Sequence, residues 1–340
     1  MPTILTATYK IVTPMFIGDA NQHADSLRPP AFKGAMRFWW RALNWNRILT
    51  SALNELKQEQ ASKQALKNLH KEESLLFGTA MDSKDKTLGQ SKFLLRIKQL
   101  HNYSKVSGNQ WPKCSANNQS SGSQYLGFGL FRMRNNEERN AFEESDKDAF
   151  TVELILRSTI NAEQKQQLHD VLIAIGLFGG LGSRARHGFG SIALTTLDGE
   201  NLNFDTNAAY EKRINSLLTI KSKQDILPPY TAISYKTKFI LGKPHENARK
   251  AHNTVGEYYQ EFRERYNRFE RKIFGLPLTK VSEERRASPL FIHIHPIKNG
   301  GYISLLLLIP AVFHHQKSLD TTDYSLIHKF MNEVEQGANQ

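Results

Sequence analysis

Alternating apolar and polar residues mark short β-strands along the chain, and stretches of helical periodicity separate them. A strand buries every second residue, whereas a helix buries residues three and four apart, so the period distinguishes the two. In the first 200 residues these patterns predict strand, helix, helix, strand, strand, helix and strand over 4–12, 32–57, 62–76, 92–100, 150–157, 162–178 and 189–197.

The second half of the chain also mixes strands and helices. Residues 288–296 and 302–309 are rich in β-forming residues, and Lys298-Asn299-Gly300-Gly301 between them predicts a hairpin. The same patterns predict a further strand over 230–241 and helices over 208–220, 247–274 and 322–335.

The order of these elements predicts an α+β protein made of two tandem ferredoxin-like sandwiches with insertions. The first sandwich would span residues 1–200, and a second, more degenerate one would span residues 201–340. Residues 101–122 are rich in Ser, Asn, Gln and Gly, which predicts a long exposed insertion in the first sandwich.

The single cysteine, Cys114, excludes a disulfide within the chain and a cysteine-based zinc site. One cysteine in 340 residues fits a reducing, cytoplasmic setting. The N-terminal residues lack a basic start and a continuous apolar stretch, so they do not predict a signal peptide. The longest apolar run, residues 303–312, is too short to span a bilayer.

The charge balance changes this picture towards a polyanionic partner. The chain carries 45 Lys and Arg against 33 Asp and Glu, a formal net charge of +12. Such an excess favours RNA, DNA or an anionic membrane surface as the partner.

The glycine-rich stretch at residues 175–192 is the strongest candidate for a binding site. Glycine permits unusual backbone turns and close approach of a ligand, and guanidinium groups suit phosphate oxygens. The stretch contains six glycines, two arginines and a histidine: Gly176, Gly179, Gly180, Gly182, Gly188, Gly190, Arg184, Arg186 and His187.

Three interpretations of this stretch compete. Gly180, Gly182 and Ala185 fit a dinucleotide fingerprint, but that motif needs a strand before it and a helix after it, and here the predicted order is reversed. A plain turn between helix and strand is the second interpretation. The third is a loop that binds the phosphates of a nucleic acid. No nucleotide or other cofactor is predicted.

A basic stripe on the predicted helix 32–57 points to the same kind of partner. Lys33, Arg37 and Arg41 recur every four residues and therefore share one face of the helix. No acidic residue lies between Lys33 and Arg47, so these cations have no neighbouring carboxylate on the helix. A stripe of this kind can follow a phosphate backbone, and a solvated helix face is the alternative.

Histidines offer two further candidate sites. His23 lies between Asp19 and Asp25 in a proline- and glycine-containing loop, where a solvated loop competes with a catalytic or metal site. His293 and His295 are two apart on a predicted strand and so share a face, but no third ligand is evident, and packing is the alternative. No metal site is predicted.

The chain resembles the RAMP superfamily, and most of all the family of first subunits of the Cmr complex, a type III-B CRISPR effector. The resemblance begins with Thr13-Pro14 and Gly18 and is most specific in residues 27–42, LRPPAFKGAMRFWWRA. Phe77-Gly78 after a helix fits the same pattern. Residues 182–191, GSRARHGFGS, match the RAMP glycine-rich loop, and residues 286–290, RASPL, match the start of a late strand.

This resemblance implies two fused ferredoxin-like folds and a non-catalytic RNA-binding subunit at one end of a ribonucleoprotein. Its partners would be other Cmr RAMP subunits, the 3′ part of a guide RNA (crRNA) and the matching single-stranded target RNA. Affinity for RNA would depend steeply on salt and little on sequence. The residues expected to contact RNA are Lys33, Arg37, Arg41, Gly182, Ser183, Arg184, Arg186, His187 and Gly188.

Two other functions remain open at this point. Some RAMP proteins are endoribonucleases that process guide precursors by acid–base chemistry, and His23 or His187 would then be the base. A subunit that binds only neighbouring proteins is the other alternative.

Overall fold

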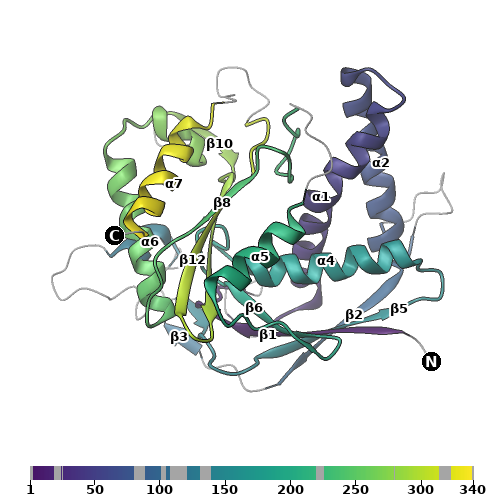
Figure 1. Ribbon diagram of the computed structural model, residues 1–340, viewed down its shortest axis with the longest axis horizontal. Helices are drawn as coiled ribbons and strands as arrows, with labels where there is room; N and C mark the ends of the chain where they lie inside the picture. Colours follow the sequence, from purple (N-terminus) through teal and green to yellow (C-terminus); the bar gives the residue numbers. More distant parts are fainter. Residues whose placement is uncertain are drawn as a thin grey trace.

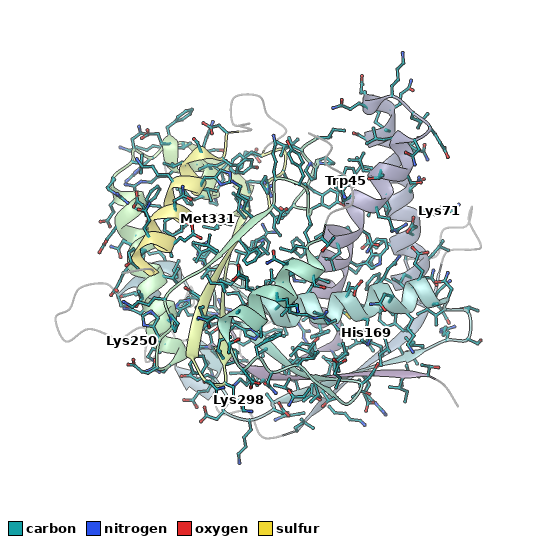
Figure 2. The ribbon with its side chains drawn as sticks, viewed as in Figure 1. Trp45, Lys71, His169, Lys250, Lys298 and Met331 are labelled. Carbon is teal, nitrogen blue, oxygen red and sulfur yellow. The ribbon has the colours of Figure 1, made fainter. Side chains whose placement is uncertain are left out.

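The computed structural model describes most of the chain, and its side chains lie in two packed regions (Figure 2). Trp45 is buried in one region and Met331 in the other, whereas Lys250 and Lys298 are exposed at the surface (Figure 2). The residues described are 3–18, 24, 26–79, 89–100, 105–107, 121–130, 139–219, 226–278, 280–313 and 323–338.

A five-stranded antiparallel sheet with the order β2-β5-β1-β6-β7 forms the first region. Its helices lie over one face of the sheet, with α1 and α4 packed against each other (Figure 1). In chain order up to Asn201 the elements are β1 (Ile4–Ile11), α1 (Pro29–Leu53), α2 (Gln58–Phe77), β2 (Phe93–Gln99), β3 (Lys105–Ser107), α3 (Gly122–Leu126), β4 (Asn140–Phe142), β5 (Phe150–Leu156), α4 (Ala162–Phe178), β6 (Ile192–Leu197) and β7 (Glu200–Asn201). Of these, β3 and β4 pair apart from the main sheet, and α3 packs outside this region.

A three-stranded antiparallel sheet with the order β11-β12-β8 forms the second region, together with a small β9-β10 pair. Helices α6 and α7 lie beside this sheet (Figure 1). The elements are α5 (Asn207–Leu217), β8 (Lys238–Leu241), α6 (Ala248–Glu264), the 3-10 helix η1 (Glu270–Phe274), β9 (Leu276–Leu278), β10 (Ser282–Arg286), β11 (Leu290–Ile297), β12 (Gly301–Leu308) and α7 (Ser325–Ala338).

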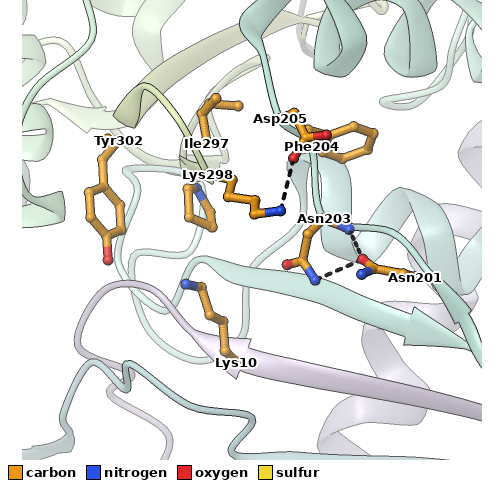
Figure 3. A pocket seen from close by; sticks show the side chains of 10 residues that line it. Lys10, Asn201, Asn203, Phe204, Asp205, Ile297, Lys298 and Tyr302 are labelled. Carbon is orange, nitrogen blue, oxygen red and sulfur yellow. Dashed lines mark hydrogen bonds and ion pairs between the residues drawn. The ribbon is translucent and has the colours of Figure 1, made fainter.

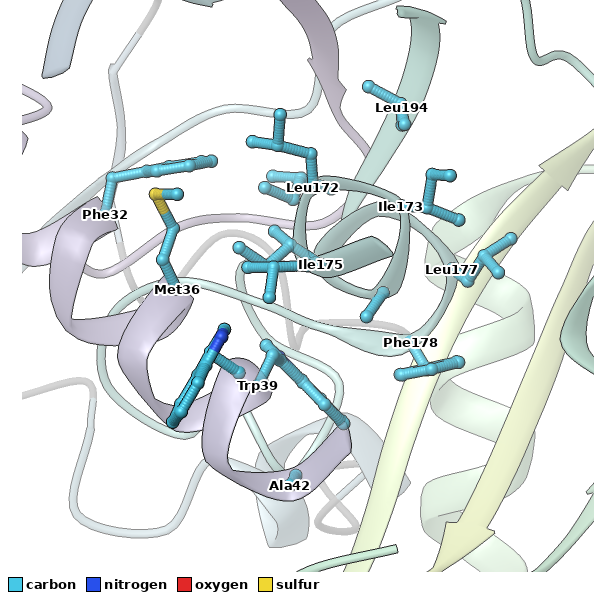
Figure 4. Close-up of a cluster of buried hydrophobic side chains, with 14 of the residues drawn as sticks. Phe32, Met36, Trp39, Ala42, Leu172, Ile173, Ile175, Leu177, Phe178 and Leu194 are labelled. Atoms are coloured by element: carbon cyan, nitrogen blue, oxygen red, sulfur yellow. The ribbon is translucent and has the colours of Figure 1, made fainter. Parts of the chain in front are cut away.

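The apolar stripe of α1 makes the core of the first region. Phe32, Met36 and Trp39 face α4, where Leu172 and Phe178 are among the side chains that meet them (Figure 4). The rings of Trp39 and Phe178 have centroids 4.7 Å apart. Burial of such aromatic side chains is the main stabilising term for a helix layer on a sheet.

The α+β class and the hairpin are confirmed. The structure is a mixture of helices and antiparallel strands, and β11 and β12 pair in register from Leu290↔Leu308 to Ile297↔Gly301. Helix α4 has the predicted bounds, because Asn161 and Gln164 form a reciprocal cap at its start. Helix α1 begins earlier than predicted, because the proline pair occupies its first turn, where no N–H donor is needed.

Two further predicted elements differ strongly from the structure in extent. The helix predicted over 247–274 ends at Glu264, and a 3-10 helix follows it, because Asn267 and Glu270 exchange side-chain to backbone hydrogen bonds that start a new turn. The strand predicted over 230–241 is reduced to β8. Its first part instead lies along α1, where the backbone N–H of Ile233 donates to the carbonyl of Ala42 at 3.0 Å.

Several sequence candidates lie outside the described residues. These are His23 with Asp19 and Asp25, Cys114, and nearly all of the insertion predicted over 101–122. In the described part of the chain, no helix is long and apolar enough to cross a membrane.

Candidate nucleic-acid interface

The glycine-rich stretch forms a compact loop between α4 and β6. The backbone N–H of Leu181 donates to the carbonyl of Gly190 at 2.9 Å and so closes the loop at its base. Gly190 has φ of +62°, and a Cβ there would lie 2.0 Å from the carbonyl oxygen of Leu181, so only glycine fits. Because a helix precedes the loop and a strand follows it, the element order that the dinucleotide fingerprint requires is absent.

The loop is held on one side by the segment that follows β1. Ser183 donates its backbone N–H to the carbonyl of Phe16, and Gly190 donates to that of Pro14, each at 2.9 Å. The hydroxyl of Thr13 donates to the carbonyl of Gly188 at 2.6 Å. Gly182, with φ of +89°, is exposed on this loop. Several backbone N–H groups that could bind an anion are therefore used to fix the loop instead.

On its other side the loop is joined to the second sheet through Arg186. The backbone N–H of Ile292 in β11 donates to the carbonyl of Arg186 at 2.9 Å. The Arg186 guanidinium lies 4.5 Å from the ring centroid of Phe291 and 5.3 Å from that of Phe38. Burial, and secondarily Arg286, lowers the pKa of Arg186 to about 10. Arg186 thus connects α1, the loop and β11.

Arg184 is the exposed cation of the loop. Its backbone has φ of +61°, a left-handed conformation that costs a residue with a Cβ about 1 kcal/mol. Its Nη2 donates to the carbonyl of Phe128, just after α3, at 2.7 Å. Strained residues of this kind concentrate at binding sites.

His187 is fixed as a neutral side chain. Its Nδ1 lies 3.0 Å from the carbonyl of Leu126, so Nδ1 carries the proton and donates. Burial lowers the pKa of His187 to about 4; the nearby Arg184, Arg263 and Arg186 act in the same direction, against the bond to Leu126. His187 is therefore unprotonated near neutral pH, which does not suit a general acid.

Close packing of α3 on α6 brings a second set of side chains to the loop. A Cβ on Gly122 would lie 2.2 Å from the carbonyl oxygen of Asn253, so the two helices touch through their backbones. Arg263 of α6 then donates from Nη1 to the Tyr125 hydroxyl at 3.2 Å. The same guanidinium lies 5.2 Å from the ring centroid of Tyr259.

These elements enclose a groove of about 560 Å³, which we call the arginine groove. The loop, α3, α6 and the segment between β10 and β11 line it, through side chains that include Tyr125, Phe128, Arg184, His187, Arg263 and Arg286. Among the residues that the structure describes, no Asp or Glu lines the groove.

The cations of the groove are not neutralised by described carboxylates. Arg184, Arg186 and Arg286 donate to the carbonyls of Phe128, Ser288 and Phe313, and Arg263 donates to a tyrosine hydroxyl. None of the four arginines forms an ion pair within the described residues. Arg184, Arg263 and Arg286 line the groove, and Arg186 lies on the same loop as Arg184. These cations repel each other, and a polyanion would relieve that repulsion.

The basic stripe of α1 has the opposite surroundings. Glu73 of α2, whose side chain is only 7% exposed, lies 2.6 Å from Nε of Arg37 and 2.7 Å from Nη1 of Arg41. Lys33 lies over the ring of Phe93 at 5.5 Å, and burial lowers its pKa. The sequence contained no acid on the same helix, but the fold supplies one from the next helix.

The paired histidines are part of the core. His293 and His295 are almost completely buried, and Nδ1 of His293 donates to the carbonyl of Gly179 at 2.8 Å. Burial lowers the pKa of His293 to about 3. His295 stacks on Tyr210 with ring centroids 4.1 Å apart. In the described part of the chain, no group of three metal-ligating side chains occurs.

A second hollow, of about 530 Å³, lies between β1 and the β11–β12 hairpin (Figure 3). Lys10, Asn203, Lys298 and Tyr302 surround it, and Lys298 lies 3.5 Å from the carboxylate of Asp205 (Figure 3). This hollow contains a carboxylate beside Lys298, whereas none of the described residues that line the arginine groove is acidic.

Sequence reasoning found the loop but missed half of the groove. Tyr125, Phe128, Arg263 and Arg286 come from segments that were interpreted separately, and nothing in their local pattern links them. Phe128 is 78% exposed and lies in a short stretch rich in aromatic residues and glycine. This stretch is the one local pattern that could have indicated a binding surface there.

Comparison with known proteins identifies related sequences and folds. The model of the RAMP superfamily matches residues 8–193. The Cmr subunit Cmr1-1 of the CRISPR system of Pyrococcus furiosus is 26% identical over 181 residues, which are 47% of this chain and 53% of that protein. The match therefore spans about half the length of that curated relative.

Two solved structures share the fold over nearly the whole chain. The crystal structure of apo Cmr1 from Pyrococcus furiosus has a TM-score of 0.61 and 19% identity, and covers 97% of this chain and 96% of that one. A chain of the cryo-EM structure of the type III-B Cmr-beta bound to cognate target RNA has a TM-score of 0.62 and 13% identity, with 99% and 100% coverage.

Proposed function

This chain belongs to the RAMP superfamily, and we propose that it is a non-catalytic RNA-binding subunit of a type III-B CRISPR ribonucleoprotein. In this role it holds the 3′ part of a guide RNA and the matching single-stranded target RNA, beside other Cmr RAMP subunits. The likeness to Cmr1-1 supports the complex, and the cluster of unneutralised arginines at the glycine-rich loop supports RNA as the ligand.

The proposed RNA contacts centre on the arginine groove. Arg184 is exposed there, and Gly182, Ser183 and Gly188 shape the loop that presents it. Arg186 and His187 act mainly by fixing the loop, since both are half-buried and hydrogen-bonded to protein carbonyls. Lys33, Arg37 and Arg41 extend the basic surface, but Glu73 neutralises part of it.

We also propose the finer architecture behind this function, two fused ferredoxin-like units at residues 1–200 and 201–340. The order β2-β5-β1-β6, with crossovers through α1 and α4, supports the first unit. The β11-β12-β8 sheet with α6 and α7 supports a reduced second unit.

The alternative of a guide-processing endoribonuclease receives less support. It requires a side chain that exchanges protons near neutral pH. Burial and the neighbouring arginines keep His187 neutral, and its one donor is already bound to Leu126. The surroundings of His187 suit a structural role better than proton transfer.

A tagged pull-down from the native host tests the proposal. Bound RNA is sequenced and bound proteins are identified by mass spectrometry. We expect short RNAs that carry CRISPR repeat tags, together with other RAMP subunits. Recovery of the chain alone, or with unprocessed precursor RNA, would contradict the proposal.

A further inference from the structure

We propose that the arginine groove is a pocket for one unpaired nucleotide of single-stranded RNA. The phosphate lies beside the guanidiniums of Arg184 and Arg263, and the base lies against the rings of Phe128 and Tyr125. This inference rests on the proposed function and adds to it a preference for an unpaired nucleotide over paired RNA.

The charge of the groove selects an anion. Arg184 and Arg263 contribute guanidiniums whose described hydrogen bonds go only to uncharged oxygens, so their charge is available to a phosphate. Arg186 and Arg286 add positive electrostatic potential, although their guanidiniums donate hydrogen bonds to the carbonyls of Ser288 and Phe313. No Asp or Glu occurs among the described lining residues, so none of them repels a phosphate.

The aromatic rim selects a base in addition to the phosphate. Phe128 is 78% exposed, the largest exposed fraction among the large apolar side chains that the structure describes. Its backbone carbonyl accepts a hydrogen bond from Arg184, and both residues line the groove. Tyr125 is held by Arg263, whose guanidinium lies 5.7 Å from its ring centroid. Stacking on such rings needs an unpaired base.

The size of the groove fits one nucleotide. A volume of about 560 Å³ lies in the range of small-molecule pockets and is far too small for a double helix. A paired base cannot reach the rings without leaving its partner, so a duplex would contact only the rim. The pocket therefore favours single strands by shape.

Two other hollows fit a nucleotide less well. The hollow around Lys10 contains the Lys298–Asp205 pair, so its charge is partly neutralised. The hollow between α6 and α7 is lined by Glu261, Glu264 and Glu333, which would repel a phosphate.

The test compares binding of a fluorescent 12-nucleotide single-stranded RNA with binding of its duplex by the full chain. We expect the wild type to bind the single strand at least tenfold more tightly. Phe128→Ala should remove about tenfold of affinity for the single strand and little for the duplex, without changing the salt dependence. Arg184→Gln should lower the slope of log Kd against log salt by about 0.7, the value of one phosphate contact.

Phe269→Ala is the matched control, because Phe269 is also exposed, at 58%, but does not line the groove. It should bind both RNAs like the wild type. If RNA binds but Phe128→Ala and Arg184→Gln leave affinity and salt slope unchanged, the pocket is wrong and the proposed function stands. If the wild type binds no RNA at low salt, the nucleotide pocket and the proposed function are both wrong. Displacement by an acidic peptide but not by RNA would assign the groove to a protein partner.

Discussion

The arginine groove and the stripe on α1 are two basic regions that the sequence presents in the same way and the fold treats differently. In the stripe, Arg37 and Arg41 share the buried carboxylate of Glu73. In the groove, Arg184 and Arg263 have only uncharged partners among the described residues. The difference shows that the availability of a cation for a phosphate is set by what the tertiary structure packs against it, not by spacing.

Removing two arginines from each region should give opposite results. Arg184→Ala with Arg263→Ala should weaken RNA binding by about 3 kcal/mol, roughly a hundredfold, with little loss of stability, because mutual repulsion is relieved. Arg37→Ala with Arg41→Ala should lower stability and weaken RNA binding less than threefold, because Glu73 is left buried without its partners. Fluorescence anisotropy and thermal melting measure the two effects. Equal losses of RNA affinity in the two double variants would show that the groove and the stripe do not differ in their availability to RNA.

Removing the Glu73 carboxylate alone should sharpen the comparison between the stripe and the groove. Glu73→Gln leaves two arginines without their anion and should destabilise the fold by about 2 kcal/mol, less than a fully buried pair because the arginines are about a third exposed. RNA affinity should stay equal or rise, since the stripe gains free charge. Glu72→Gln, which affects the exposed pair with Arg47, is the control and should change stability by less than 1 kcal/mol. A drop in RNA affinity for Glu73→Gln at a temperature where it is folded would contradict this.

Acid should act on the groove through His187. Its pKa in the folded chain, about 4, lies below the usual 6.5, so the unfolded chain binds the extra proton first. The contribution of His187 to stability is therefore complete above pH 6.5 and is lost as the pH falls from 6.5 towards 4, at about 1 kcal/mol per pH unit. Melting curves recorded from pH 7.5 to 4.5 give the free energy of unfolding as a function of pH. In His187→Gln this free energy should fall less steeply with acid, by the equivalent of about one proton. Parallel curves for the two proteins would argue against a neutral, buried His187.

The smallest effect is expected in the hollow around Lys10. Lys298 is exposed and lies 3.5 Å from Asp205, an arrangement whose contribution to stability is small. Lys298→Ala should change stability by less than about 0.5 kcal/mol and RNA affinity by less than twofold, because its charge is already balanced. Chemical denaturation and anisotropy measure both. A tenfold loss of RNA affinity would show that this hollow, too, belongs to the RNA path.

The sequence by itself determined most of the local elements and pointed to a polyanionic partner. Periodicity placed α4, the β11–β12 hairpin and the strands β1, β2, β5 and β6, because burial of one face leaves a local pattern. The charge excess and the glycine-rich loop indicated a polyanion, since both are properties of composition and short motifs.

Only the tertiary structure decided which cations remain available and what surrounds them. Glu73 contacts Arg37 and Arg41 from another helix. Arg263 lines the same groove as Arg184, although the two lie almost 80 positions apart in the sequence. The end of α6 at Glu264 likewise depends on a cap formed by Asn267 and Glu270 that helical periodicity does not reveal. Ion pairs and grooves depend on distances of a few ångströms between segments distant in sequence, and no local pattern encodes those distances.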